Sequence, residues 1–268
     1  MITFGDYVRP KSLDEASELL KTKKPARIIG GGLYVRMGDR RIGLAVDLSD
    51  LELDYIKETD DSFEIGAMTS LRSLETDSAL NAHYGDVFKQ SLKDIVGVQL
   101  RNIATVGGTV YQKYGFSDVI PALLAVDAKV CFHSTGEISL KEYLAEDGFR
   151  RDVLEKVVIP KAKEVCASNQ TIRISRGDYA MLVTVVAKID GKYNVTVGAR
   201  PRRAALALKA MDYLNSAGEV TEEVAIKAGE LAAEELVFGT NTRGTAEYRE
   251  DVCKVLIKRA VLEVSSCK

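Results

Sequence analysis

The sequence predicts an α+β protein of two domains, and two observations support that prediction. The chain has 268 residues, which is enough for about two domains of ordinary size. Helix and strand signals are intermixed up to a shift in composition near residues 160–163, whereas beyond it strands come first and helices follow. Segregated strands and helices are typical of an α+β domain. We therefore expect one domain over residues 1–162 and a second over 163–268.

In the first domain, the apolar spacing of residues 13–20 predicts a helix, and Ser12 with Glu15 forms a capping-box pattern before it. Residues 101–110 are rich in glycine and have little periodicity. The remaining patterns predict strands at 26–29, 44–48, 55–57, 62–66, 129–133 and 153–160, and helices at 71–80, 86–95 and 119–126.

In the second domain, strands are expected at 171–175, 181–189 and 193–198, and helices at 204–215, 221–235 and 245–264. The turn Asp190-Gly191 joins two of these strands. This order predicts a three-stranded antiparallel sheet followed by a helical bundle.

Composition excludes several classes of protein. Lys and Arg number 37 and Asp and Glu 39, for a net charge of −2, so nucleic acid is not an expected partner. The longest apolar run, Val119–Val126, is too short to span a membrane, and the N-terminal residues lack a secretion signal. The four cysteines form no C-x-x-C pair and predict reduced thiols in a cytoplasmic protein without a metal site. His83 and His133 are interpreted as ordinary surface or strand residues. The run Arg200–Arg203 is interpreted as a solvated helix start or a surface that pairs with a partner's acidic face, with a binding patch as the alternative.

The first glycine cluster is Gly30-Gly31-Gly32, which follows a predicted strand and leads into Leu33-Tyr34-Val35. Residues without Cβ allow a sharp turn, so that successive N–H groups can converge on a phosphate. A Rossmann fingerprint is excluded, because its third glycine would fall at Val35. A plain glycine turn remains the alternative.

The second cluster runs from Thr105 through Val106, Gly107 and Gly108 to Thr109. It offers a second candidate phosphate site with two hydroxyl groups. Asp118 follows at the start of an apolar helix, where it could cap the helix or accept hydrogen bonds from ribose or ribityl hydroxyls. Together the two clusters predict a dinucleotide whose pyrophosphate is held between two lobes.

The run from Arg101 to Gly108, followed by Phe116-Ser117-Asp118 and Pro121–Ala125, resembles the second flavin motif of the FAD-binding (medium) subunits of molybdenum hydroxylases. These are the xanthine, nicotinate and carbon monoxide dehydrogenase families. The resemblance covers the whole chain, and its other parts are Tyr7–Ala16, Ile65–Thr69, Arg173–Ala180 and Glu247–Arg249.

The resemblance implies a two-lobed FAD-binding domain of the vanillyl-alcohol oxidase (PCMH) type, with lobes of about 1–55 and 56–162, and a flavoprotein C-terminal domain. It also implies that Gly30–Val35 and Thr105–Thr109 hold the FAD pyrophosphate and that Ser117 and Asp118 lie by a phosphate or the ribityl chain. Leu154 is implied as an apolar contact to the flavin. The cofactor-binding residues expected are Gly30, Gly31, Gly32, Leu33, Tyr34, Val35, Thr105, Val106, Gly107, Gly108, Thr109, Ser117, Asp118 and Leu154.

The resemblance further implies an electron-transfer subunit without catalytic side chains of its own, because the flavin carries the reaction. Its partners would be a molybdenum-binding large subunit with molybdopterin and a small subunit with [2Fe–2S] clusters. Its FAD would pass electrons to NAD+ or another acceptor. Two alternatives are an assembly subunit without FAD and a flavoenzyme similar to UDP-N-acetylenolpyruvoylglucosamine reductase.

The chain departs from the family pattern at the first cluster. The family has Ala-Gly-Gly-Thr-Asp or Ala-Gly-Gly-His-Ser where this chain has Gly30–Tyr34, so two side-chain hydrogen-bonding groups are lost. We hypothesise that Tyr34 instead covers one face of the isoalloxazine, or shields it from O2 or from a partner cluster.

Overall fold

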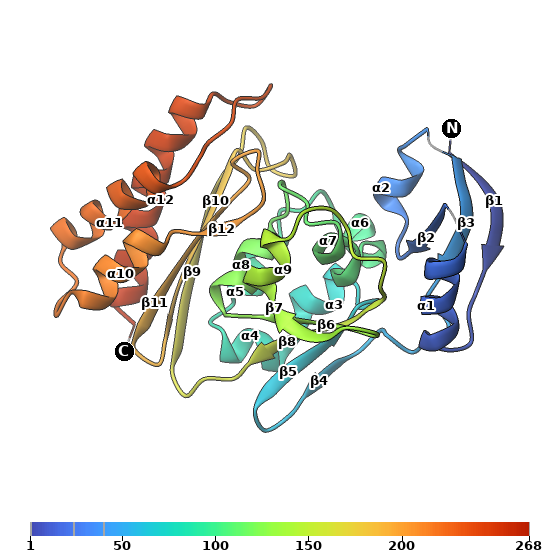
Figure 1. Cartoon of the computed structure of the whole chain (residues 1–268). Helices are drawn as coiled ribbons and strands as arrows, with labels where there is room; N and C mark the ends of the chain where they lie inside the picture. Colours follow the sequence, from blue (N-terminus) through green and yellow to red (C-terminus); the bar gives the residue numbers. More distant parts are fainter. Residues whose placement is uncertain (1, 24, 40, 268) are drawn as a thin grey trace.

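A computed structural model describes residues 2–23, 25–39 and 41–267 of the chain (Figure 1). The elements form three blocks that follow one another along the sequence: a small N-terminal block, a middle block and a C-terminal block.

The N-terminal block is a three-stranded parallel sheet in the order β1-β3-β2. It consists of β1 (Thr3–Val8), α1 (Leu13–Thr22), β2 (Ala26–Ile29), α2 (Leu33–Arg36) and β3 (Arg41–Asp47). Strand β1 is an element that the sequence patterns did not predict. Ser12 accepts the N–H of Glu15 at 3.1 Å, but the Glu15 carboxylate accepts the N–H of Lys11, so only half of the expected capping box forms.

The middle block is an antiparallel sheet in the order β4-β5-β8-β6-β7, flanked by short helices. Its strands are β4 (Ile56–Glu58), β5 (Ser62–Gly66), β6 (Lys129–Phe132), β7 (Gly136–Ser139) and β8 (Leu154–Pro160). Its helices are α3 (Leu71–Thr76), α4 (Ser78–His83), α5 (Val87–Leu92), α6 (Val98–Ile103), α7 (Val106–Tyr111), α8 (Val119–Ala125) and α9 (Leu140–Ala145).

One predicted helix of this block is divided, and one stretch without a predicted element is helical. The helix expected at 71–80 is interrupted at Asp77, whose backbone is extended and whose side chain accepts the N–H of Leu80 at 2.8 Å, which starts α4. The glycine-rich stretch 101–110 is largely helical, because Thr105 caps α7 and the valines of α7 are buried. Glycine lowers helix propensity, and packing overrides it here.

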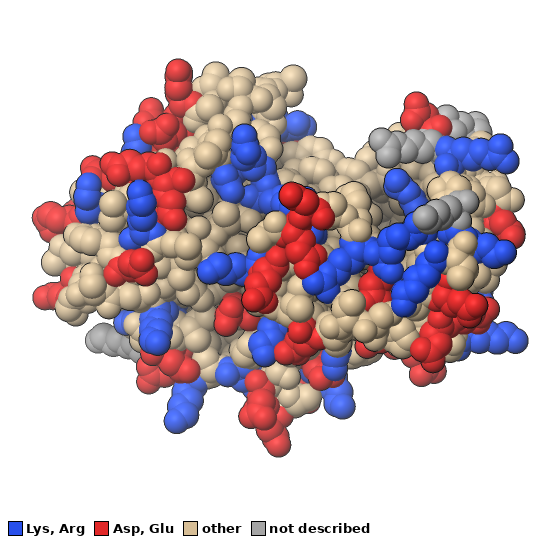
Figure 2. Space-filling model, viewed as in Figure 1, with Lys and Arg blue, Asp and Glu red and all other residues tan. Residues whose placement is uncertain are grey.

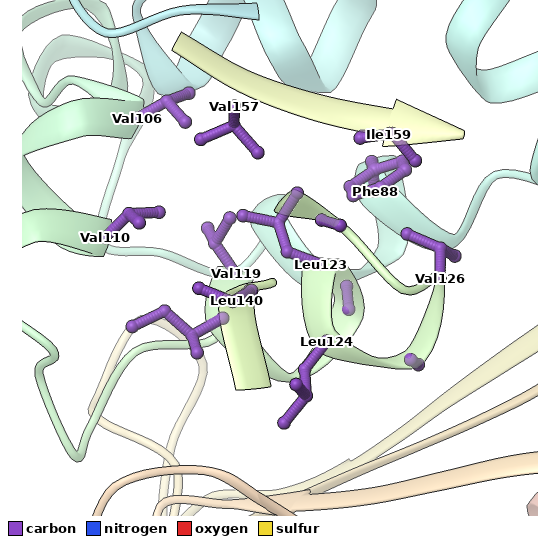
Figure 3. Close-up of a cluster of buried hydrophobic side chains, with 14 of the residues drawn as sticks. Phe88, Val106, Val110, Val119, Leu123, Leu124, Val126, Leu140, Val157 and Ile159 are labelled. Carbon is purple, nitrogen blue, oxygen red and sulfur yellow. The ribbon is translucent and has the colours of Figure 1, made fainter. Parts of the chain in front are cut away.

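Helix α8 lies at the centre of the main core, and all seven of its residues are buried. Figure 3 shows Leu123 and Val119 of α8 pointing toward Val157 of β8 and toward Val106 and Val110 of α7. The second glycine cluster is therefore anchored directly in the main hydrophobic core.

The C-terminal block has a four-stranded antiparallel sheet in the order β12-β11-β10-β9. Helices α10, α11 and α12 lie on one side of it and the middle block on the other (Figure 1). The predicted antiparallel sheet and helices are confirmed. The first strand both starts and ends earlier than the expected 171–175, and β12 is added where a helix start was expected. The bounds are β9 (Val165–Ile172), β10 (Leu182–Ile189), β11 (Lys192–Gly198), β12 (Ala205–Leu206), α10 (Leu208–Ser216), α11 (Glu222–Glu235) and α12 (Ala246–Ser265).

The prediction that all four cysteines are reduced thiols is wrong for two of them. Cys166 on β9 and Cys267 just beyond α12 form a disulfide, with their Cα atoms 6.4 Å apart. They are 101 residues apart in sequence, and they meet because α12 packs along β9 and β10. Cys131 and Cys253 are free.

Within the described ranges, no helix is long and apolar enough to cross a membrane. The same residues include no group of three or more His, Cys, Asp or Glu side chains suited to a metal ion.

Candidate functional site

A cavity of about 430 Å³ lies where the three blocks meet. Its walls come from residues 30–37 of the N-terminal block, from 95–119 of the middle block and from 173–179 of the C-terminal block. Figure 2 shows the surface hollowed between the part that carries α2 and the rest of the molecule. The predicted residues that line the cavity are Gly30, Gly31, Gly32, Leu33, Tyr34, Val35, Thr105, Gly108, Thr109, Ser117 and Asp118.

The first glycine cluster forms the entry to α2 and leaves its N–H groups free. Gly32 adopts a left-handed conformation with φ of 69°, and no side chain caps the short helix. The first N–H groups of a helix have no intrahelical partner. Among residues 2–23, 25–39 and 41–267, no group accepts a hydrogen bond from the N–H of Gly31, Gly32, Leu33, Tyr34 or Val35.

The two glycine clusters lie against each other, although about 75 residues separate them in the sequence. A Cβ on Gly31 would lie 1.7 Å from the carbonyl oxygen of Ile103, and one on Gly30 would lie 2.8 Å from Oγ1 of Thr105. Glycine is therefore required at Gly31 by the close approach of another backbone.

The second cluster differs from the expected nest, because its N–H groups are already used. Val106 donates to the Thr69 carbonyl at 2.9 Å and Gly107 to the Ala67 carbonyl at 2.8 Å. Gly108 donates to Oγ1 of Thr105 at 3.1 Å. Val106 and Gly107 are buried behind the cavity wall, whereas Gly108 and Thr109 line it. This cluster offers a ligand a bare glycine surface and hydroxyl groups.

Asp118 does not cap α8, contrary to one of the two roles considered for it. The Ser117 hydroxyl accepts the N–H of Ile120 at 3.2 Å instead. The Asp118 carboxylate accepts a hydrogen bond from Nη2 of Arg173 at 2.6 Å, and both side chains are buried. Burial raises the pKa of Asp118 to about 6, and the guanidinium of Arg173 opposes that rise.

An aromatic cluster forms the other side of the cavity. The ring centroid of Tyr34 lies 4.8 Å from that of Tyr114 and 5.0 Å from that of Phe116. The ring centroids of Phe116 and Tyr179 are also 5.0 Å apart. The hydroxyls of Tyr34 and Tyr179 are hydrogen-bonded to each other. Burial and this hydrogen bond raise the pKa of Tyr34, so the phenol stays neutral.

Leu154 lies outside the cavity, on β8 in the main core, with 3% of its surface exposed. Conversely, the prediction did not include Arg173, Asp178 and Tyr179, which line the cavity from the loop between β9 and β10. The segment carries part of the family resemblance, but no local pattern indicates that it reaches the cavity.

One other prediction from the sequence is corrected. Arg200 is buried and Arg203 half-buried, since they donate to backbone carbonyls of Val237 and of Leu144 and Glu146. They are therefore structural groups rather than solvated surface charges. His133 lies between two carboxylates, Asp14 at 2.8 Å and Glu155 at 2.7 Å.

Comparison with known proteins shows the family and the fold of the chain. Residues 2–162, more than half of the chain, match the family described as the FAD binding domain in molybdopterin dehydrogenase. Residues 169–264 match the CO dehydrogenase flavoprotein C-terminal domain. The CO dehydrogenase structure from Oligotropha carboxidovorans superposes with a TM-score of 0.88 over 97% of each chain at 24% identity, which shows the shared fold.

Two curated relatives are similar in sequence. The nicotine 6-hydroxylase medium subunit of Paenarthrobacter nicotinovorans is 25% identical over 97% of each chain. The nicotinate dehydrogenase FAD-subunit of Eubacterium barkeri is 27% identical over 61% of this chain and 60% of its own. The chain thus belongs to the FAD-binding subunits of the molybdenum hydroxylase family, and it is an oxidoreductase subunit with an FAD-binding domain and a CO dehydrogenase-type C-terminal domain.

Proposed function

We propose that this chain binds FAD in the cavity between the three blocks, with the pyrophosphate at the free N–H groups of residues 31–35. The supporting observation is that residues 31–35, which line the cavity, have five consecutive N–H groups without an acceptor in the described part of the chain. The chain also belongs to an FAD-binding family. Free N–H groups at a helix start are suited to a phosphate anion. FAD, when bound, would supply the two-electron chemistry of the subunit.

The other residues of the site would orient and enclose the cofactor. Gly108 allows close approach on the opposite wall, and Thr105 and Thr109 supply hydroxyls. Ser117 and Asp118 are suited to a ribose or ribityl hydroxyl. Val106, Gly107 and Leu154 would support the site from behind, because they are buried in or near the main core.

Tyr34 would cover one face of the isoalloxazine. Its ring already lies among Tyr114 and Phe116 on the cavity wall, where an aromatic ligand could stack. Tyr34→Ala with an unchanged flavin spectrum and reoxidation rate would contradict this role.

We further propose the division into domains 1–162 and 163–268 and an assembly with a molybdenum-binding large subunit and a [2Fe–2S] small subunit. In this assembly the bound flavin would receive electrons from the [2Fe–2S] clusters and NAD+ or another acceptor would receive them next. The names of the relatives as medium subunits and FAD-subunits support the heteromeric arrangement. Location in the cytoplasm stays a prediction.

An assembly subunit without FAD is a second candidate, favoured by one contact. The hydroxyl pair of Tyr34 and Tyr179 joins the N-terminal block to the C-terminal block across the cavity, and it must open if a ring is to enter there.

Titration of the purified protein with FAD and with FMN tests the proposal. Quenching of flavin fluorescence is expected with FAD and much less with FMN, because FMN lacks the pyrophosphate. A colourless protein that rejects added FAD would favour the assembly role. Anaerobic NADH tests the acceptor, because bleaching of the bound flavin is expected if NAD+ is the natural acceptor.

A further inference from the structure

Arg173 is one of the residues of the C-terminal block that line the candidate FAD site. It follows β9 directly, and its side chain is 9% exposed while that of its ion-pair partner Asp118 is 7% exposed. Nη2 donates to Asp118 at 2.6 Å and Nη1 donates to the carbonyl oxygen of Asp178 at 2.7 Å. The guanidinium thus connects the start of α8 to the loop between β9 and β10.

One donor of this guanidinium has no partner. Nε of Arg173 is buried, and within the described part of the chain no group accepts its hydrogen bond. An unpaired buried donor is unfavourable because it has lost its hydrogen bond to water, and such groups are rare in folded proteins. Since Arg173 lines the cavity, a bound ligand can supply the missing acceptor.

The neighbouring carboxylates leave Nε of Arg173 without an acceptor, so that it can donate to a ligand. Asp178 also lines the cavity, but its carboxylate is paired with Arg243 at 2.8 Å. Asp118 is therefore the carboxylate paired with Arg173, and a buried ion pair of this kind gives little net stability. Both members of the pair line the cavity, from two different blocks.

We propose that Arg173 recognises the cofactor: its Nε–H donates to an oxygen of bound FAD while its Nη2 holds Asp118 oriented toward a hydroxyl of the same ligand. This proposal rests on the proposed function of the cavity. It assigns a binding residue to the C-terminal block, so neither glycine cluster forms the complete site without that block.

Three variants test the proposal in the full-length chain. Arg173→Lys keeps the positive charge beside Asp118 but removes Nε–H and the planar geometry of the guanidinium. Arg173→Met removes the charge as well. Arg176→Met is the matched control, because Arg176 lies on the same loop with an 85% exposed side chain paired to Asp94.

FAD affinity and the thermal stability of the FAD-free protein are both measured. We expect Arg173→Lys to weaken FAD binding about tenfold, as for the loss of one charge-assisted hydrogen bond, with a melting temperature close to that of the wild type. Arg173→Met is expected to weaken binding further and to lower the melting temperature, because Asp118 is left unpaired. Arg176→Met is expected to change neither quantity.

Wild-type affinity in Arg173→Lys would overturn the proposal while leaving the proposed function intact. If Arg173→Lys does not fold, the double variant Arg173→Met with Asp118→Asn removes both charges together, and it must still bind FAD at least tenfold more weakly. Wild-type protein that binds no FAD overturns the proposed function itself, and the role of Arg173 with it.

Discussion

The two glycine clusters have similar compositions but differ in how their backbone groups are used. At Gly31–Val35, the N–H groups have no acceptor in the part of the chain that the structure describes. At Val106–Thr109, each N–H is bonded to Thr69, Ala67 or Thr105. A free N–H can bind an anion, whereas a bonded one cannot without breaking its existing bond. Only the first cluster is therefore suited to hold a phosphate by its backbone.

The two clusters also differ in what supports them. Gly30–Val35 belongs to the small N-terminal block, whose core is formed by residues such as Ala16, Leu44 and Val46. Thr105–Thr109 belongs to α7, whose valines are part of the main core. Added volume at the first cluster should therefore change the cavity, and added volume on the buried side of the second, at Gly107, should change stability.

The largest effect is expected for Gly31→Ala. The new methyl group would lie 1.7 Å from the Ile103 carbonyl oxygen, which belongs to a backbone that cannot swing aside. The first cluster must then move away from the second. Overpacking of this kind costs about 3 kcal/mol, so FAD affinity is expected to fall about a hundredfold, as measured by titration of flavin fluorescence.

Gly218→Ala is the control for this variant, because a methyl group there meets nothing within 4 Å. It should bind FAD as the wild type does. If Gly31→Ala also binds normally, then the contact between the two clusters does not define the site.

A smaller effect of a different kind is expected for Gly107→Ala. The methyl group would lie 2.6 Å from the Ala67 carbonyl oxygen. Alanine gains about 1 kcal/mol over glycine in a helix, but overpacking costs about 1–3 kcal/mol, so we expect a net loss of stability in urea unfolding. FAD affinity of the folded fraction should stay near the wild-type value, since Gly107 does not line the cavity.

Gly108→Ala, one residue further along the chain, separates the effect on FAD affinity from the effect on stability. Its methyl group would meet only the Thr105 hydroxyl, at 3.0 Å, and Gly108 lines the cavity. Stability near or above that of the wild type is expected, with weaker FAD binding. If both variants lower stability and leave affinity unchanged, then the second cluster has no contact with the cofactor.

The comparison also explains how far the sequence could predict this site. Gly31 and Gly108 stand out because glycine clusters mark turns and loops in a sequence, and the family resemblance places both residues in the site. The N–H groups of Val106 and Gly107 are bonded to Thr69 and Ala67, which lie on a distant segment, so no local pattern could reveal that these groups are in use. Arg173 was missed for the same reason, since its partner Asp118 is 55 residues away.

The smallest effect, a change in stability, is expected at His133, which connects the N-terminal block that carries the first cluster to the middle block that carries the second. Both ring nitrogens of His133, in the middle block, are hydrogen-bonded to carboxylates. Nε2 lies 2.8 Å from Asp14 of α1, and Nδ1 lies 2.7 Å from Glu155 of β8. Hydrogen bonds to Asp14 and then Glu155 raise the pKa of His133. The protonated ring therefore ties the N-terminal block to the middle block.

The sign of the pH dependence follows from that raised pKa. The stabilisation is complete below the unfolded-state pKa of about 6.5 and is lost as the pH rises through the higher folded-state value. His133→Gln should lower the melting temperature at pH 6 and change it little at pH 9. The loss of unfolding free energy at pH 6 should be less than about 1 kcal/mol, because Asp14 is exposed. An equal loss at both pH values would mean that packing of the ring, rather than its charge, holds the block that carries the first cluster.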